Sequence, residues 1–271
     1  MSRRTSSTRH GYTLIELLVV MSIISVLIGL TLAGVQRARA NAQRAACMNN
    51  MKNQGLAVMN FESAHGSLPP GALQGPFPVF GVPDGASHGL WVVLLGYLDQ
   101  DAVAARYRLD LSFDHPDNQP AARAIIKVLQ CPAEPPGRVE QWEPAWNYAG
   151  IADYGPLEVN PFLADIAMID PVDNFEGPLP VNGRVRIPEI TDGTSQTILL
   201  SEAGSGGGTA WCSSTNLLSV RTLFADSSAH RGCANVCLAD GSVRFLRSSL
   251  RTRVLAALAT RAGGEVIGED F

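Results

Sequence analysis

The chain has 271 residues and a formal net charge of −4, with 46% hydrophobic and 17% charged residues. This length and apolar content suffice for one or two folded domains with a core, so they exclude a disordered chain. Because the charge balance is mildly acidic and no block of Lys and Arg carries interleaved aromatic residues, we expect no nucleic-acid partner.

The chain begins with a short basic segment followed by a long apolar run. Between Tyr12 and Gln36 the only ionisable side chain is Glu16, and residues 19–35 are uncharged. At 1.5 Å per residue, such a helix crosses a hydrocarbon layer of about 30 Å. The small residue Gly11 precedes the apolar run, whereas the cleavage site of a secretory signal peptide follows it. We therefore predict a transmembrane helix that is not a conventional signal peptide.

Residues 11–20 read GYTLIELLVV. This stretch resembles the prepilin processing motif of type IV pilins and type II secretion pseudopilins. The resemblance implies that a prepilin peptidase cleaves after Gly11 on the cytoplasmic side and that the new amino terminus, Tyr12, becomes methylated. Tyr12 stands where the family usually has Phe, a conservative departure. Arginines flank both ends of the apolar run, so the positive-inside rule does not decide the orientation, which is taken from the resemblance.

Glu16 is the one carboxylate of the apolar run. A charge inside a membrane helix costs about 2.5–3.5 kcal/mol on insertion scales and normally faces a partner. The resemblance implies that Glu16 pairs with the amino terminus of a neighbouring subunit on assembly. Two alternatives stay open: Glu16 lies at the level of the lipid headgroups, or it pairs with the amine of its own Tyr12, which is spaced i, i+4 from it.

The helical pattern continues beyond the apolar run and stops at Gly66, just before Pro69 and Pro70. Its apolar stripe consists of Cys47, Met51, Gly55 and Val58. We predict a leader of residues 1–11 and one long helix, with residues 12–35 in the membrane and residues 36–65 packing on a head domain. The head comprises residues 66–271.

Within the head we expect a second helix over residues 88–107, whose apolar stretch 89–98 is too short to span a membrane and is therefore buried. A strand is predicted over residues 197–200 and a short helix over residues 248–262. Asp240-Gly241 lies between two β-prone runs and predicts a type I′ hairpin turn, in which both central residues need a positive φ.

Several segments occur in the order typical of one family. They are the processing motif, residues 47–52, 66–71 and 91–100, Cys131-Pro132, residues 147–150 and 190–197, His230 with Asp240-Gly241, and residues 260–266. They resemble the pilin-like bacterial proteins that carry a carboxy-terminal H-x9-D-G motif and the domain of unknown function numbered 1559. The resemblance implies an α+β pilin-like fold, with a long N-terminal helix and an antiparallel β-sheet head, and it gives His230, Asp240 and Gly241 no known role.

The five cysteines are too few for a disulfide scaffold and lack the C-x2-C pairs of a zinc site. The family resemblance makes Cys47 and Cys131 our first disulfide candidates, because both lie in family motifs. Cys233 and Cys237 would be about 13 Å apart in an extended strand, too far to bridge each other. Cys212 can pair with either of them.

His230 and Asp240, near Ser227 and Ser228, are the pair that most resembles an acid and a base. The turn position of Asp240 explains it without catalysis, because its side chain can bond the local backbone. No H-E-x-x-H motif and no Cys-His nucleophile context occurs, so we expect no enzyme and no catalytic residue; a ligand or metal contact by this pair stays open.

Calcium is the one cofactor that the resemblance suggests, because major pseudopilins use a loop-bound calcium ion. The candidate carboxylates are Asp153, Glu158, Asp170, Asp173, Glu176 and Asp192. They form no D-x-[DN]-x-[DN]-G loop, so solvated loop carboxylates are the favoured interpretation and no cofactor is expected.

We therefore expect a structural, pseudopilin-like subunit, anchored by a single pass in the cytoplasmic (inner) membrane with its head outside the cytoplasm. Its expected partners are prepilin peptidase, the membrane and other pilin-like subunits. The alternative is a membrane-anchored module that binds a glycan or another ligand without forming a filament. That module would use an aromatic surface of Trp142, Trp146, Tyr148 and Tyr154, and packing of these side chains in the core stays open as the alternative. A third hypothesis, an anchored hydrolase, would require His230 for turnover.

Overall fold

The computed structural model of the protein describes residues 13–134, 139–142, 147–152, 154–158, 176–203, 209–219, 230, 233–247 and 249–264. The chain divides into two compact units, Met1–Gln43 and Arg44–Phe271. The head unit thus begins at Arg44, further along the chain than residue 36, where we expected head packing to begin. Arg44 stacks its guanidinium over the ring of Phe245, 3.1 Å from the ring centroid.

The first helix, α1, spans Leu14–His65 and belongs to both units. It ends before Gly66, whose φ of 69° is the left-handed conformation in which glycine commonly terminates a helix. The predicted stop is therefore confirmed. The buried stripe is also confirmed; the buried residues of α1 are Cys47, Met51, Gln54, Gly55, Ala57, Val58 and Phe61.

A five-stranded sheet with the order β10-β9-β6-β5-β8 forms the larger sheet of the head. Its pairs are antiparallel except β5 with β8, which is parallel. The α+β class with an antiparallel head is confirmed. The strands are β5 (Tyr154–Glu158), β6 (Ile198–Glu202), β8 (Leu218–Ser219), β9 (Cys233–Leu238) and β10 (Val243–Arg247).

Two smaller sheets complete the described strands. One has the order β3-β4-β7 and the other pairs β1 with β2, all antiparallel. Their strands are β1 (Ala72–Gln74), β2 (Ser87–Gly89), β3 (Val139–Trp142), β4 (Asn147–Ala152) and β7 (Thr209–Ala210).

The expectation of one helix over residues 88–107 is wrong. The segment begins inside β2 and then forms α2 (Leu90–Leu94), the 3-10 turn η2 (Leu95–Leu98) and α3 (Asp101–Ala104). Asp99 adopts a φ of 56°, which breaks the helical path between η2 and α3. The burial of the apolar stretch is confirmed, since Trp91, Leu94 and Leu95 are at most 1% exposed.

The remaining described helical segments are short. They are η1 (Pro78–Phe80), η3 (Pro116–Asn118), α4 (Gln119–Ala122), η4 (Lys127–Leu129), η5 (Ile187–Glu189) and α6 (Thr252–Ala259). The predicted C-terminal helix is thus present as α6, with Leu258 buried in the core.

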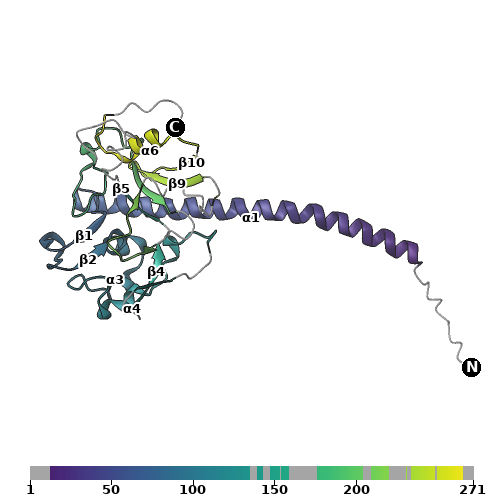
Figure 1. Ribbon diagram of the computed structural model, residues 1–271, viewed down its shortest axis with the longest axis horizontal. Coiled ribbons are helices and arrows are strands. Elements are labelled where there is room, and N and C mark those ends of the chain that lie inside the picture. Colours follow the sequence, from purple (N-terminus) through teal and green to yellow (C-terminus); the bar gives the residue numbers. More distant parts are fainter. Residues whose placement is uncertain are drawn as a thin grey trace, which may run out of the picture. The chain divides into compact units, whose positions relative to one another are not determined.

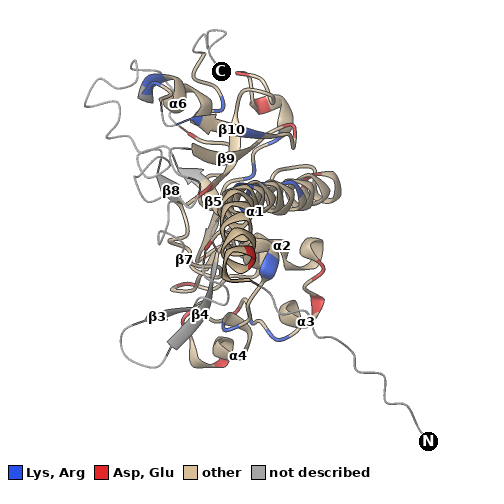
Figure 2. Ribbon diagram, turned by 90° about the vertical axis from the view of Figure 1, so that its right-hand side faces the viewer, with Lys and Arg blue, Asp and Glu red and all other residues tan. Residues whose placement is uncertain are grey.

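The second half of α1 lies between two layers of the head, with β9, β10 and α6 on one side and β4, α3 and α4 on the other (Figures 1 and 2). Side chains of β9 alternate between the two faces of their sheet, as strand geometry requires. Cys237 packs in the main core with α1, whereas Val236 and Leu238 pack in a second core with α6. The sheet is therefore covered on both faces.

Candidate functional sites: the start of α1 and a buried Cys-His-Glu cluster

The processing motif lies at the start of α1. Gly11 and Tyr12 fall outside the described residues, so the cleavage position and the expected pairing of Glu16 with the Tyr12 amine are not placed. Oε2 of Glu16 accepts hydrogen bonds from the backbone N–H of Thr13 at 2.8 Å and from its hydroxyl at 2.9 Å. In return, the N–H of Glu16 donates to Oγ1 of Thr13 at 3.4 Å.

These reciprocal bonds form a capping box, which satisfies backbone donors at the first turn of a helix. The sequence analysis missed this role of Thr13, although T-x-x-E before an apolar run is a recognisable signal for it. Both bonds to the Glu16 side chain use Oε2, which leaves Oε1 for a second donor. The carboxylate thus has a local function as part of the cap of α1.

The first half of α1 exposes an apolar surface on all sides. From Leu14 to Val35 every side chain is exposed, for example Leu14 at 82% and Leu30 at 71%. The helix is long and apolar enough to cross a membrane, with a window of mean hydropathy 2.6. By contrast, large apolar patches are rare on soluble proteins and mark sites of membrane or protein contact.

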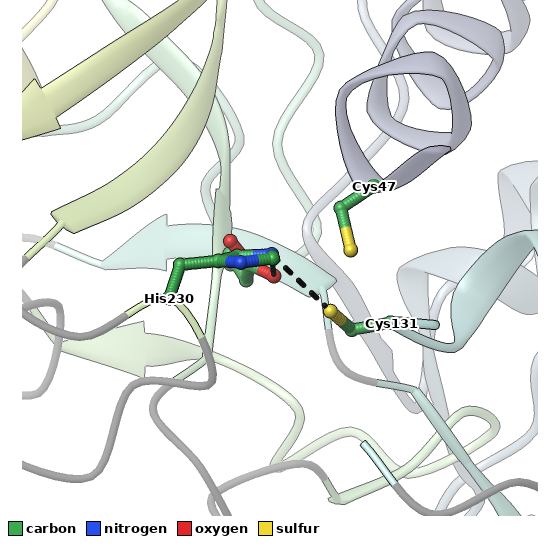
Figure 3. Close-up of side chains that lie close together, drawn as sticks. Cys47, Cys131 and His230 are labelled. Atoms are coloured by element: carbon green, nitrogen blue, oxygen red, sulfur yellow. Dashed lines mark hydrogen bonds and ion pairs between the residues drawn. The ribbon is translucent and has the colours of Figure 1, made fainter. Parts of the chain in front are cut away.

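Four side chains from distant parts of the head converge in a buried cluster. Cys47 comes from α1, Cys131 follows η4, Glu202 ends β6 and His230 precedes β9. Their sulfur, imidazole and carboxylate ligand atoms all lie within 4.8 Å of one another. Figure 3 shows the sulfur atoms of Cys47 and Cys131 and the ring of His230 directed toward a common space. We call these four residues the Cys-His-Glu cluster.

Hydrogen bonds and charge hold the cluster together. Nε2 of His230 lies 3.5 Å from Sγ of Cys131 and 3.3 Å from Oε1 of Glu202. The other carboxylate oxygen, Oε2, accepts a 2.9 Å bond from the side-chain amide of Asn235 and a 3.3 Å bond from its backbone N–H. Asn235 therefore orients Glu202 so that Oε1 faces His230.

The cluster shifts the protonation of its members. The contacts of its ring with Cys131 and then with the Glu202 carboxylate raise the pKa of His230 to about 10, despite the opposing effect of burial. Hydrogen bonding with Cys47 and burial raise the pKa of the Cys131 thiol. His230 therefore carries its proton near neutral pH, and the Cys131 thiol stays neutral.

The disulfide candidates Cys47 and Cys131 are brought together, as the family resemblance implied. All five cysteines are in the thiol form in this structure. The Cys47–Cys131 disulfide, and a bridge from Cys212 to Cys233 or Cys237, therefore stay predictions. Glu202 is the cluster member that sequence analysis missed, because a single acidic residue at a strand end carries no local signal.

Asp240 and Gly241 form the hairpin turn between β9 and β10, and the predicted turn type is wrong. The N–H of Gly241 donates to the carbonyl of Leu238, and the N–H of Leu238 donates to the carbonyl of Ser242, both at 2.8 Å. Gly241 has a φ of 75°, whereas Asp240 has no positive φ. This is a three-residue loop in which a left-handed glycine follows a type I turn.

The expected turn role of Asp240 is confirmed. Its Oδ1 accepts a 2.8 Å hydrogen bond from the N–H of Ser242, and its own N–H donates to the carbonyl of Thr194 at 3.0 Å. His230, by contrast, is engaged in the Cys-His-Glu cluster with Cys131 and Glu202. The structure thus gives the two residues separate environments.

The hairpin turn docks directly on α1. Nζ of Lys52 donates a 2.6 Å hydrogen bond to the carbonyl of Gly241. A Cβ on Gly55 would lie only 2.5 Å from Sγ of Cys237, so glycine is required for this close approach of β9 to the helix. Gly241 therefore anchors the hairpin end of β9 to α1.

The calcium candidates do not assemble into a described site. Asp153, Asp170 and Asp173, and the side chain of Glu158, lie outside the described residues. Asp192 accepts hydrogen bonds from the N–H groups of Gly263 at 2.7 Å and Gly264 at 2.8 Å, and Glu176 pairs with Arg261. The two described carboxylates thus hold the C-terminal segment, and we derive no role for calcium.

The proposed aromatic binding surface is not supported where it can be assessed. The side chain of Tyr154 is fully buried, so it does not belong to an exposed aromatic surface. The side chains of Trp142, Trp146 and Tyr148 lie outside the described part of the chain.

Comparisons with known families assign the two parts of the chain. Residues 6–32 match the prokaryotic N-terminal methylation motif, and residues 36–219 match the family described as protein of unknown function (DUF1559). No curated protein and no solved structure matches the chain. The methylation motif suggests a type IV pilin-like protein that prepilin peptidase processes, and together with the long apolar helix it fits a membrane-anchored protein. Because the second match covers more than half of the chain, the protein belongs to the DUF1559 family.

Proposed function

We propose that the chain is a pilin-like or pseudopilin-like structural subunit. Prepilin peptidase removes the leader after Gly11 and the new terminus is methylated at Tyr12. The apolar half of α1 then anchors the protein by a single pass in the cytoplasmic (inner) membrane, with the head outside. The same segment joins other pilin-like subunits in a type II secretion or type IV pilus-like assembly. The observation that carries the proposal is the match of the methylation motif to residues 6–32, the segment that leads into the exposed apolar helix.

The exposed apolar surface supports two successive environments for this helix. A lipid bilayer covers such a surface before assembly, and the helices of neighbouring subunits cover it in a filament. Ser22, Ser25 and Thr31 return their hydroxyls to carbonyls of their own helix at 2.8–2.9 Å, so their side chains demand no water. The segment is therefore suited to both environments.

Glu16 supplies the polar contact of the proposed assembly. Its Oε2 caps the first turn through Thr13, which positions the carboxylate at the start of the helix. Oε1 then accepts from the methylated amine of a neighbouring subunit, which offsets the cost of placing a charge in the membrane. This contact fixes the register between subunits.

The proposal gives the head a structural and not a catalytic role. His230 is bonded within the Cys-His-Glu cluster, and Asp240 is bonded within its turn. A proton-transfer pair would need hydrogen-bond reach between the base and the group that it serves. The bonds of His230 instead connect it to Cys131 and Glu202, and the bond of Asp240 stabilises the hairpin turn.

A cleft in the head favours the second candidate, a membrane-anchored binding module. Its volume is about 690 Å³, within the range of small-molecule sites. It is lined by α1, through residues such as Asn53 and Asn60, and by the segments 97–100 and 125–128, which include Tyr97, Gln100 and Lys127. Under this alternative, changes in the cleft would abolish function and changes at Glu16 would not.

Three substitutions at the start of α1 test the assembly proposal. Glu16→Ala removes the charge and the cap, Glu16→Gln removes only the charge because Gln also serves in a capping box, and Thr13→Val removes the hydroxyl of the cap but keeps the charge. Photo-cross-linking from an unnatural residue at position 28 in native cells reports subunit contacts. Membrane fractionation and N-terminal mass report insertion and cleavage.

Both Glu16 variants should insert and be cleaved, yet lose the cross-linked oligomer. Thr13→Val should retain the oligomer, because the carboxylate remains. Equal oligomer formation by wild type and Glu16→Gln would contradict the pairing with a neighbouring amine. Unchanged oligomers and unchanged function in all three variants would favour the binding module.

A further inference from the structure

We propose that the Cys-His-Glu cluster is a binding site for one soft divalent cation of the zinc type, with Cys47, Cys131, Glu202 and His230 as ligands. The site would join α1 to three segments of the head that are distant in the sequence. This inference is independent of filament assembly, since all four residues belong to the head unit.

The donor types fit such a cation. Two thiolates and one imidazole favour zinc and related transition ions over calcium or magnesium, which prefer oxygen ligands. A carboxylate oxygen completes a set of four, the usual coordination number of structural zinc. This site could not be predicted from the sequence, because its ligands lack the C-x2-C spacing and each ligand lies in a different segment of the chain.

The distances fit a tetrahedral arrangement. With zinc–sulfur bonds of about 2.3 Å and zinc–nitrogen or zinc–oxygen bonds of about 2.0–2.1 Å, neighbouring ligands in a tetrahedron lie about 3.6 Å (sulfur to nitrogen) and about 3.4 Å (nitrogen to oxygen) apart. Nε2 of His230 lies 3.5 Å from Sγ of Cys131 and 3.3 Å from Oε1 of Glu202. Because all four donor atoms lie within 4.8 Å of one another, small side-chain rotations complete the tetrahedron.

Two buried polar atoms point to a missing partner at this place. Oε1 of Glu202, a residue only 2% exposed, has the ion-pair contact with Nε2 of His230 at 3.3 Å but no hydrogen bond of good geometry among the described residues. The hydroxyl of the fully buried Tyr154 lies near Cys47 but makes no hydrogen bond of good geometry within the described chain. A cation would satisfy Oε1, and a Cys47 thiolate would accept from the Tyr154 hydroxyl.

The cluster also has the outer support that metal sites use. Asn235 holds Oε2 of Glu202 through two hydrogen bonds and so fixes the direction of Oε1. Such partners of a ligand typically change metal affinity by about 10–100-fold when they are removed. On binding, the cation displaces the two thiol protons and the imidazolium proton, which leave to solvent as the metal–ligand bonds form.

The test uses the full chain in detergent micelles, reduced and freed of metal by chelation, and titrated with Zn²⁺ or Co²⁺. We expect one equivalent to bind, with the absorption of tetrahedral, thiolate-bound cobalt. Cys47→Ser, Cys131→Ser and His230→Gln should each weaken zinc binding by at least about 100-fold, and Asn235→Ala by about 10–100-fold. Cys233→Ser, which removes a thiol outside the cluster, is the matched control and should bind as wild type does.

Circular dichroism of each metal-free variant checks that a loss of binding is not a loss of fold. Substoichiometric binding by folded wild type would overturn the proposal. Equal binding by Cys131→Ser and Cys233→Ser would also overturn it. So would recovery of the protein from native cells without metal and with Cys47 and Cys131 joined, because a disulfide consumes both sulfur ligands.

Discussion

The two halves of α1 differ in apolar content and have opposite surroundings. In the first half, Leu17, Ile24 and Ile28 are 62%, 44% and 59% exposed, and in the second half Cys47, Met51 and Val58 are fully buried. The second half packs against strands and helices of its own head, whereas the side chains of the first half are exposed. One helix thus contributes its second half to folding and leaves its first half for contacts outside the subunit.

Because of this difference, substitutions in the two halves of α1 should affect two separate properties, the stability of the head and membrane insertion or assembly. Changes in the second half should lower the stability of the head without altering membrane insertion. Changes in the first half should alter insertion or assembly and leave the head intact.

The largest effect is expected from Met51→Ala. Met51 is fully buried, and truncation of such a side chain costs about 2–5 kcal/mol of unfolding free energy through lost burial and a residual cavity. Chemical denaturation in micelles, followed by tryptophan fluorescence, measures it. Leu56→Ala, on the same half but 46% exposed, and Ile24→Ala should change the stability far less. Equal losses in all three variants would contradict the division of the helix.

A charge in the first half should produce the converse result. Val26→Arg places an arginine within the apolar segment, at a cost of about 2.5–3.5 kcal/mol on insertion scales. Fractionation should show less protein in the membrane, while denaturation of the head stays unchanged. Val26→Leu is the control for side-chain size. Undiminished insertion of Val26→Arg would show that this segment does not cross the bilayer.

Glycine-to-alanine substitutions sharpen the comparison by the addition of a single methyl group. At Gly55 the new Cβ would lie 2.5 Å from Sγ of Cys237, so we expect overpacking to cost about 1–3 kcal/mol. At Gly29 a new Cβ meets nothing within 4 Å, so head stability should not fall. Thermal unfolding of the two variants measures this difference in head stability. A Gly55→Ala variant as stable as wild type would show that glycine is not required at this position.

The smallest effect is a pH dependence confined to the head. His88 is fully buried, and burial lowers its pKa from 6.5, opposed by its bond to the Leu109 carbonyl. The folded state therefore keeps His88 neutral while the unfolded chain gains a proton below pH 6.5, so stability falls as the pH falls through that value. His88→Gln should flatten this part of the profile, and an identical slope in the variant would exclude His88 as its source.

Local chemistry made the outline of the fold predictable. The uncharged run, the stripe from Cys47 to Val58 and the stop at Gly66 each depend on helix periodicity or glycine conformation, which neighbouring residues determine. The break at Asp99 was not predictable in this way, because burial of Trp91 and Leu95 against the core overrides a continuous helical pattern. Similarly, the register of β9 with β10 selects the three-residue loop at Asp240 that the dipeptide alone did not reveal.

The two candidate sites also differ in whether local sequence or tertiary contacts bring their residues together. The motif around Glu16 is contiguous, so its residues could be named from the sequence, and the cap by Thr13 was readable from the same letters. The Cys-His-Glu cluster depends on tertiary contacts between segments up to 183 residues apart, from Cys47 to His230. Family resemblance placed Cys47 with Cys131, but Glu202 joins them only through the position of β6 beside β9.

The mass and N-terminal sequence of the protein from its native cells, with and without a functional prepilin peptidase, test the central claim most directly. The account predicts a chain that begins with methylated Tyr12 when the peptidase is present and that retains its leader when the peptidase is absent. An uncut chain beginning at Met1 or Ser2 in both cases would contradict it and leave the anchored binding module as the better explanation.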